Sequence, residues 1–366
     1  MNNNSNDNND NREFVDLREG AEEQQNISGS QSPTPAHYPP SPRKKNKTSF
    51  AILAAILVIA GLLGGSSLVI SSVRSVHGTS FNLSSNGSLI PDGGINTGTG
   101  ITLDINLISN SVVLRTHSRS DIVITYTPPS TGSYTHPHYE FNQGNSVLRI
   151  IEERRNNWFG VNNFQRGVLT VNIPENTDGV FESLSVSATS GRVEIFGDDG
   201  RKLANNVSLT VTSGGVFAFD FAADRVNLGA TSGGVTLRGV EATSGNITAH
   251  STSGGVTANR LNASGDISLT ATSGGIRADG VSADGNLSVG STSGGVRASG
   301  VFAAGDLSAN VTSGGVTLEN SEILGNVTAR ATSGGITFTN VSFDQNRASL
   351  STTSGRITVN GERLDR

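Results

Sequence analysis

The chain has 366 residues, a formal net charge of −5 and no cysteine. The lack of cysteine excludes disulfides, thiol chemistry, thiolate-bound metal and an acylated cysteine as lipid anchor, and the mild negative charge gives no reason to expect nucleic acid as a partner. Glycine is abundant at 45 residues whereas aromatic residues make up 5%. This composition indicates many tight turns around a narrow core of small side chains, with little room for an internal ligand pocket.

Residues 1–48 form a segment rich in asparagine and proline. Seven of the first eleven residues are asparagine, and five of the ten prolines lie between Pro33 and Pro42. So little apolar surface cannot offset the entropy of ordering the chain, which predicts a disordered tail. Pro39, Pro42 and Lys44 match a proline-rich ligand pattern for aromatic grooves. The plainer interpretation is a solvated tail without such a partner.

A membrane-spanning helix is predicted within residues 49–72. Four basic residues, three of them lysines, precede an uncharged stretch of 21 residues from Phe50 to Ile70, and a helix of that length spans roughly 32 Å. The positive-inside rule then leaves the tail in the cytoplasm and places the rest outside the cytoplasmic membrane. A cleaved signal peptide is the alternative. The spacing of Ala60 with Gly64, and of Gly61 with Gly65, would allow a homodimer through this helix.

Residues 73–180 combine a linker with an irregular β region, which we expect to cover one end of the repeats that follow. Apolar and polar residues alternate there in short runs, as strands with one buried face require. These runs lie at 101–107, 112–115, 122–126, 147–151 and 168–173.

From residue 181 to 366 the sequence repeats with a period of about 20 residues. Full copies of Thr-Ser-Gly-Gly followed by Val or Ile begin at Thr212, Thr231, Thr252, Thr272, Thr292, Thr312 and Thr332, and Thr-Ser-Gly-Arg copies begin at Thr189 and Thr353. A fixed period of this size is typical of stacked repeats. The sequence therefore predicts an all-β protein, a single-chain β-solenoid of about 20-residue coils.

Each repeat position has an expected role. The apolar-x-apolar triplet after the glycines, such as Val235-Thr-Leu237, predicts a short strand with one buried face. The phrase glycines, and the Gly-Asn or Gly-Asp pairs such as Gly265-Asp266, are expected at turns of positive φ. Hydroxyl ladders of Thr and Ser are expected along the corner. The structural turn glycines are Gly214, Gly215, Gly233, Gly234, Gly254, Gly255, Gly274, Gly275, Gly294, Gly295, Gly314, Gly315, Gly334 and Gly335.

The chain resembles a large family of cell-envelope β-repeat proteins known as the "putative adhesin" family. The likeness is carried by the Thr-Ser-Gly-Gly-Val phrases and the Gly-Asn-Leu and Gly-Asp-Ile columns, and by the runs 169–174 and 184–191. The resemblance implies a β-solenoid at a cell surface, often behind a single membrane helix. It brings no established catalytic residues.

The sequence offers only weak candidates for a chemical site. The phrase serines have no base that repeats beside them, so we expect no catalytic residue, and the Asp and Asn columns lack the second carboxylate of a calcium site. His136 and His138, with Glu140 and His117, suggest a metal site weakly because Pro137 favours a turn or an edge strand. Trp158 is expected to plug one end of the solenoid. Cofactors and metals are expected to be absent.

The stacked Arg277 and Arg297 could favour an anionic glycan or lipid headgroup. Two solvated arginines are the plainer interpretation. The sequence as a whole predicts a non-enzymatic single-pass membrane protein that displays a β-solenoid at the cell surface or in the envelope, as an adhesion module or spacer. Its expected partners are the lipid bilayer and a surface glycan or protein. The alternatives are an envelope-sensing signalling protein that uses its tail, and a carbohydrate-active β-helix enzyme.

Overall fold

The computed structural model describes residues 81–84, 100–118, 121–129, 137–142, 146–152, 166–174, 181–198 and 200–364. All of them belong to one compact unit, Val69–Arg366. The expected tail at 1–48 and the expected membrane helix at 49–72 lie outside these residues. Within the described part of the chain, no helix is long and apolar enough to cross a membrane.

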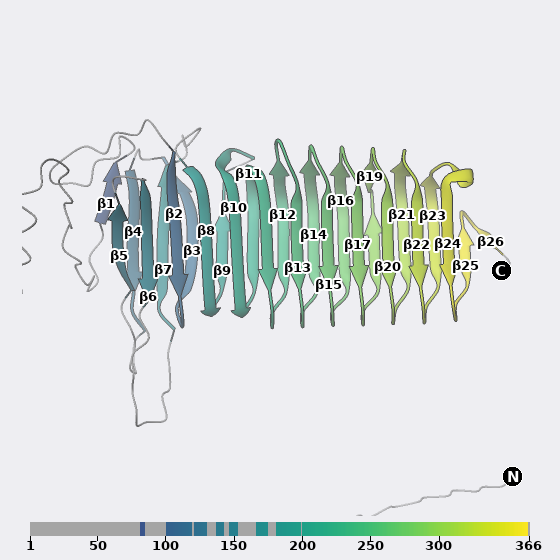
Figure 1. Cartoon of the computed structure of the whole chain (residues 1–366), viewed down its shortest axis with the longest axis horizontal. Helices are drawn as coiled ribbons and strands as arrows, with labels where there is room; N and C mark the ends of the chain where they lie inside the picture. Colours follow the sequence, from purple (N-terminus) through teal and green to yellow (C-terminus); the bar gives the residue numbers. More distant parts are fainter. Residues whose placement is uncertain are drawn as a thin grey trace, which may run out of the picture. The chain divides into compact units, whose positions relative to one another are not determined.

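The described part of the chain is an all-β solenoid, as the period predicts. Each coil supplies one strand to each of two ladders, and successive coils pair in parallel (Figure 1). The first ladder contains β9 (Val193–Phe196), the start of β11 (Val216–Ala230), β12 (Val235–Ala242), β14 (Val256–Ala263), β16 (Ile276–Ala283), β18 (Val296–Ser299) with β19 (Phe302–Ala303), β21 (Val316–Ile323), β23 (Ile336–Ser342) and β25 (Ile357–Val359). The second contains β8 (Phe181–Ser190), β10 (Lys202–Ser213), the end of β11, β13 (Ile247–Ser251), β15 (Ile267–Ala271), β17 (Leu287–Ser291), β20 (Leu307–Val311), β22 (Val327–Ala331) and β24 (Ala348–Thr352).

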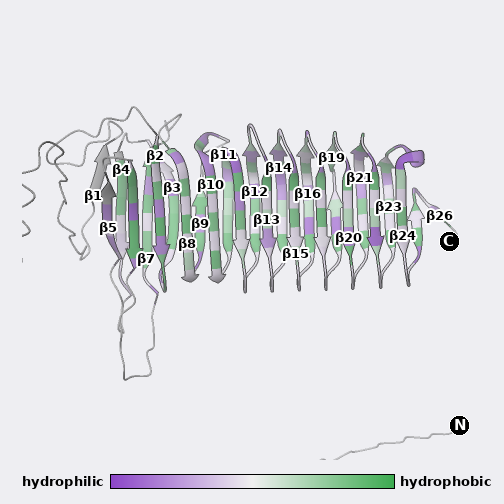
Figure 2. Ribbon diagram, in the orientation of Figure 1, coloured by the Kyte–Doolittle hydropathy of each residue, from purple (hydrophilic) through white to green (hydrophobic). Residues whose placement is uncertain are grey.

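The core lies between the two ladders and follows the predicted alternation. In β12, Val235 and Leu237 are buried while Thr236 between them faces outward. Val235 is in register with Val256 of the next coil, so identical positions stack into buried columns. Hydropathy alternates along the strands in the same way (Figure 2). Because the side-chain period of a strand is two, the register keeps every apolar column inside.

Residues 101–174 extend the same stack, but not in chain order. β2 (Ile101–Leu107) lies between β6 (Val147–Glu152) and β8, and it is parallel to both. β3 (Ser111–His117) likewise lies between β7 (Val168–Pro174) and β9. The five expected runs are thus confirmed as strands. The coil formed by β2 and β3 is inserted between two coils that follow it in sequence.

Antiparallel strands flank the parallel stack. β4 (Asp121–Thr127) pairs with β7, β1 (Phe81–Ser84) pairs with β4, and β5 (Pro137–Asn142) pairs with β6. At the other end, β26 (Glu362–Leu364) folds back on β25. These strands cover backbone groups that would otherwise present an open edge to another chain. A 3-10 turn, η1 (Gln345–Arg347), precedes β24, and Asp344 caps it.

Candidate functional site

The glycines of the phrase allow the coils to approach closely at the corner. None of the fourteen predicted turn glycines has positive φ. The prediction that glycine is required at these positions because φ is positive is therefore wrong. From Gly214 onward, a Cβ added to the first glycine of a phrase would lie well inside 3.0 Å of the first glycine's backbone in the preceding coil. For the second glycine, the closest backbone atom, in the following coil, would lie at 2.8–3.4 Å. Close backbone contact therefore leaves no space for a side chain at the first glycine. The second glycine position is less constrained.

This difference explains the two degenerate phrases. Both keep the first glycine, at Gly191 and Gly355, and replace the second with Arg192 or Arg356. The corner itself is joined by backbone groups: the N–H of Ser273 donates to the carbonyl oxygen of Thr252 at 2.8 Å, and the same bond recurs in successive coils. The ladder along this corner is thus formed by backbone groups, whereas the sequence predicts one formed by Thr and Ser hydroxyls. The Thr and Ser side chains of most phrases point into solvent.

A series of hydrogen bonds from side chains to backbone joins the Gly-Asn and Gly-Asp corners of successive coils. The side-chain Oδ1 of Asn246 accepts the backbone N–H of Asp266 at 2.8 Å, and Oδ1 of Asp266 accepts the N–H of Asn286 at 2.7 Å. Asp306 and Asn326 continue the series. Asn and Asp alternate here because only an acceptor oxygen is needed. These hydrogen bonds account for the column without calcium.

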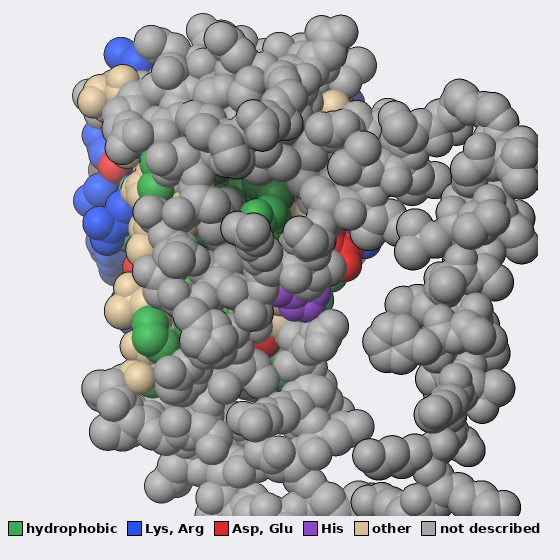
Figure 3. All heavy atoms as spheres, turned by 90° about the vertical axis from the view of Figure 1, so that its left-hand side faces the viewer, with side chains coloured by type: hydrophobic (Ala, Val, Ile, Leu, Met, Phe, Trp, Pro, Cys, Tyr) green, Lys and Arg blue, Asp and Glu red, His purple; other side chains and the backbone are tan. Residues whose placement is uncertain are grey.

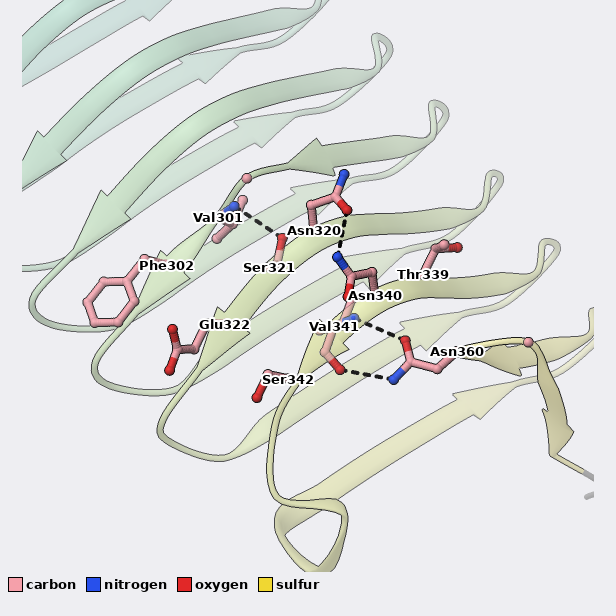
Figure 4. Close-up of a pocket in the computed structure, with 12 residues that line it drawn as sticks. Val301, Phe302, Asn320, Ser321, Glu322, Thr339, Asn340, Val341, Ser342 and Asn360 are labelled. Atoms are coloured by element: carbon pink, nitrogen blue, oxygen red, sulfur yellow. Dashed lines mark hydrogen bonds between the residues drawn. The ribbon is translucent and has the colours of Figure 1, made fainter.

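Eight positive-φ positions form a different column, at which the strands of the first ladder from β11 to β25 bend or end. Its members are Asp220, Gly239, Arg260, Gly280, Gly300, Asn320, Asn340 and Asn360. The bend leaves a groove of about 1090 Å³ along the outer surface near the C-terminal coils. Figure 4 shows Phe302, Glu322 and Ser342 on one side of it and Thr339 on the other.

The asparagine side chains in this groove are hydrogen-bonded within it. Asn340 donates through Nδ2 to Oδ1 of Asn320 at 2.9 Å, and the amide of Asn360 bonds both the N–H and the carbonyl of Val341 at 3.0 Å (Figure 4). Glu322 is the one titratable residue in the lining. Hydrolysis of a glycosidic bond uses two carboxyl groups, and this groove provides one. The lining therefore lacks the pair of carboxyl groups that such catalysis uses.

A smaller groove of about 490 Å³ runs along the outer face of the second ladder. His250 and Arg330 lie at its two ends, and Gly290 leaves space between them. A ring nitrogen of His250 is 2.9 Å from the hydroxyl of Thr270. The lining contains no carboxylate, so His250 has no acid partner there.

The other residues weighed from the sequence do not converge on a site. His136 and Trp158 lie outside the described residues. Pro137 begins β5, which within the described residues pairs with β6 alone, so its expected edge position is confirmed. Glu152 is 3% exposed and accepts hydrogen bonds from the backbone N–H groups of residues 108–110, which holds the loop between β2 and β3. The described residues contain no group of three or more metal-ligating side chains.

A family model described as Toastrack DUF4097 matches residues 101–301, which is more than half of the chain. The chain belongs to the Toastrack DUF4097 family. The match begins at β2, so the coil inserted out of chain order is part of the Toastrack domain.

One solved structure is similar to the Toastrack chain: a "putative cell adhesion protein" from Clostridium sporogenes ATCC 15579. The two chains are 12% identical with a TM-score of 0.26, over 59% of this chain and 95% of the other. No curated protein sequence matches this chain.

The Toastrack domain carries an unexpected aromatic cluster on the outer face of the first ladder. Phe196 and Phe219 stack with ring centroids 5.2 Å apart, and Phe217 lies 6.4 Å from Phe219. Each ring is covered by a guanidinium: Arg115 over Phe196, Arg192 over Phe217 and Arg238 over Phe219, at 4.6–5.4 Å from the centroid. Such cation–π contacts hold the guanidiniums in place at the surface.

Proposed function

We propose that this protein is a non-enzymatic, single-pass membrane protein that displays its Toastrack solenoid at the cell surface or in the envelope. It serves there as an adhesion module or as a structural spacer. The observation that carries the proposal is the parallel pairing of successive coils from β2 to β25, built from buried apolar columns and backbone ladders. A rigid stack of this kind presents long outer faces to a partner.

The absence of a converging reactive set in the described residues supports a non-enzymatic role. The larger groove holds one carboxylate and the smaller holds one imidazole without an acid. Membrane attachment is supported by the sequence: four basic residues precede 21 uncharged residues at Phe50–Ile70, long enough to span a bilayer. With this orientation the solenoid lies outside the cytoplasmic membrane, where it can meet a glycan or protein ligand.

The lack of native cysteine allows a direct test of the topology, since one introduced cysteine is the only labelling site. Ser273→Cys places a thiol at an exposed corner of the solenoid, and Ser5→Cys places one in the tail. Cells with the outer envelope opened and the cytoplasmic membrane sealed are treated with a membrane-impermeant maleimide. We expect labelling of the Ser273→Cys protein at once and of the Ser5→Cys protein only after lysis. The opposite pattern would overturn the proposed topology.

A further inference from the structure

The outer face of the first ladder carries a band of arginines, here called the arginine strip. Six of the seven consecutive strands from β3 to β18 contribute one arginine each, on or directly beside the strand. The members are Arg115, Arg192, Arg238, Arg260, Arg277 and Arg297. They occupy several columns of this face: Arg115 and Arg238 share one column, and Arg277 and Arg297 share another. At about 4.8 Å per coil the strip extends for about 29 Å. Figure 3 shows Lys and Arg side chains gathered along one edge of the molecule.

The guanidiniums form the outer layer of this face and the carboxylates lie beneath them. In the pair between Arg192 and Glu194, the side chains are 59% and 18% exposed, and in the pair between Arg297 and Glu319 they are 60% and 30% exposed. Asp220 is 28% exposed and is bonded by both Arg238 and Arg260. An approaching partner therefore meets positive charge first, although the chain as a whole carries −5.

Two members of the strip lack a counterion in the described residues. Arg115 and Arg277 make no ion pair there, and Arg277 is the direct register partner of Arg297. Like charges directly opposite each other on neighbouring strands destabilise a sheet. An anion bound between Arg277 and Arg297 would remove this repulsion, and guanidinium groups bind carboxylates through two parallel hydrogen bonds.

The surroundings of the strip favour a polysaccharide over other polyanions. Thr236 and Thr257 precede Arg277 in the same outward column, and Thr317 and Thr337 follow Arg297. Their hydroxyls offer donors and acceptors that match sugar hydroxyls. Binding of single-stranded nucleic acid relies on free aromatic faces, but the phenylalanine rings here are covered by guanidiniums and by one another. A band of charge that crosses several coils also fits a linear chain better than a compact anion.

We infer that the arginine strip binds a linear acidic polysaccharide whose carboxylates contact Arg277, Arg297 and the neighbouring arginines of the same face. This inference deepens the proposed function and rests on it for access to polysaccharide outside the cell. The contact is electrostatic and faces solvent, so binding weakens as salt rises. The strip would thus be the adhesive surface of the solenoid.

The test measures binding of the purified full-length chain, kept in detergent, to polygalacturonate by isothermal titration calorimetry at low and physiological salt. Fully methyl-esterified polygalacturonate has the same backbone without the charge and is the matched ligand. We expect binding to the acid form and none to the ester. Equal binding to both forms, or to neither, would overturn the inference. Tighter binding to oligo-dT or to phosphatidylglycerol vesicles would also overturn it, in favour of that partner.

The double variant Arg277→Gln/Arg297→Gln tests the residues. Its affinity for polygalacturonate should fall about tenfold or more, since two charge-assisted contacts are lost. The control is Arg225→Gln/Arg330→Gln, which removes the same charge from two exposed arginines of the second ladder. An equal loss in the control would show that net charge, and not the strip, governs binding. The topology experiment is independent: reversed topology with intact binding refutes the proposed function alone, and correct topology without binding refutes this inference alone.

Discussion

The side-chain Oδ1 of Asp306 accepts the backbone N–H of Asn326 at 2.8 Å, across the corner between two coils. The same oxygen accepts the Asn326 side-chain Nδ2 at 3.0 Å. These bonds, first that from the backbone, hold the pKa of Asp306 below its usual value of 3.8. Because the ionised form is the better acceptor, the carboxylate stabilises the folded state at neutral pH.

The stability contributed by Asp306 should therefore depend on pH. A carboxyl group whose pKa is lowered by folding contributes fully above its unfolded pKa and loses that contribution as the pH falls through its folded pKa. Asp306→Asn keeps an acceptor oxygen, as Asn286 and Asn326 do in the same column, but cannot titrate. We expect the wild-type melting temperature to fall relative to that of the Asp306→Asn variant as the pH drops below about 4. Asp284→Asn, at an exposed position, is the control, and an equal pH effect there would contradict the assignment.

The two glycines of one phrase should respond differently to a methyl group. A Cβ at Gly274 would meet the backbone of Gly254, which cannot move without separating the coils, whereas a Cβ at Gly275 would lie 3.1 Å from the carbonyl oxygen of Gly295. We expect Gly274→Ala to lower the free energy of unfolding by about 3 kcal/mol or more and Gly275→Ala by about 1 kcal/mol. Urea denaturation followed by circular dichroism gives both values. Similar losses for the two variants would show that the corner relaxes more easily than its geometry indicates.

The repeat made most of the solenoid predictable, because its period fixes which residues share a column. The triplet Val235-Thr-Leu237 identified the buried face, and the phrase spacing identified the stack. The insertion of β2 and β3 between later coils could not be predicted. No phrase marks that coil, and its pairings with β6 and β8 join segments more than forty residues apart.

The surface sites were predictable only in part. Arg277 and Arg297 are one period apart and were recognised as neighbours. Arg238 and Phe219 are also register partners, and an alignment of the repeats on the phrase could have paired them. Arg115 lies 81 residues before Phe196, so only the fold brings them together. The positive-φ column could not be recognised in the sequence because four residue types, Asp, Gly, Arg and Asn, occupy it.

The bend that shapes the larger groove can be tested at Asn340, where φ is +53°. Glycine adopts this conformation freely and asparagine tolerates it, but a β-branched residue is strained there. We expect Asn340→Gly to change the free energy of unfolding by less than about 1 kcal/mol, and Asn340→Val to lower it by about 2 kcal/mol. Chemical denaturation of both variants is the measurement. A valine variant as stable as the glycine variant would contradict the requirement for positive φ.

The repulsion between Arg277 and Arg297 should be visible as a gain in stability when it is removed. Most positions of this outward column from Thr236 to Thr358 are threonine, a residue that suits an exposed strand. Arg277→Thr takes away one of the two like charges and keeps the pair between Arg297 and Glu319. We expect the free energy of unfolding without ligand to rise by about 0.5 kcal/mol.

The control for this prediction is Arg330→Thr, on the second ladder, where Asn310 is the partner on the preceding coil and repulsion is absent. In urea denaturation at low salt, the two variants should differ in their free energy of unfolding. At high salt this difference should disappear because the repulsion is screened. Loss of stability in Arg277→Thr at low salt would show that the guanidinium is stabilised by contacts other than those described. If Arg277→Thr is more stable and also binds polygalacturonate more weakly, Arg277 lowers the stability of the fold and contributes to binding.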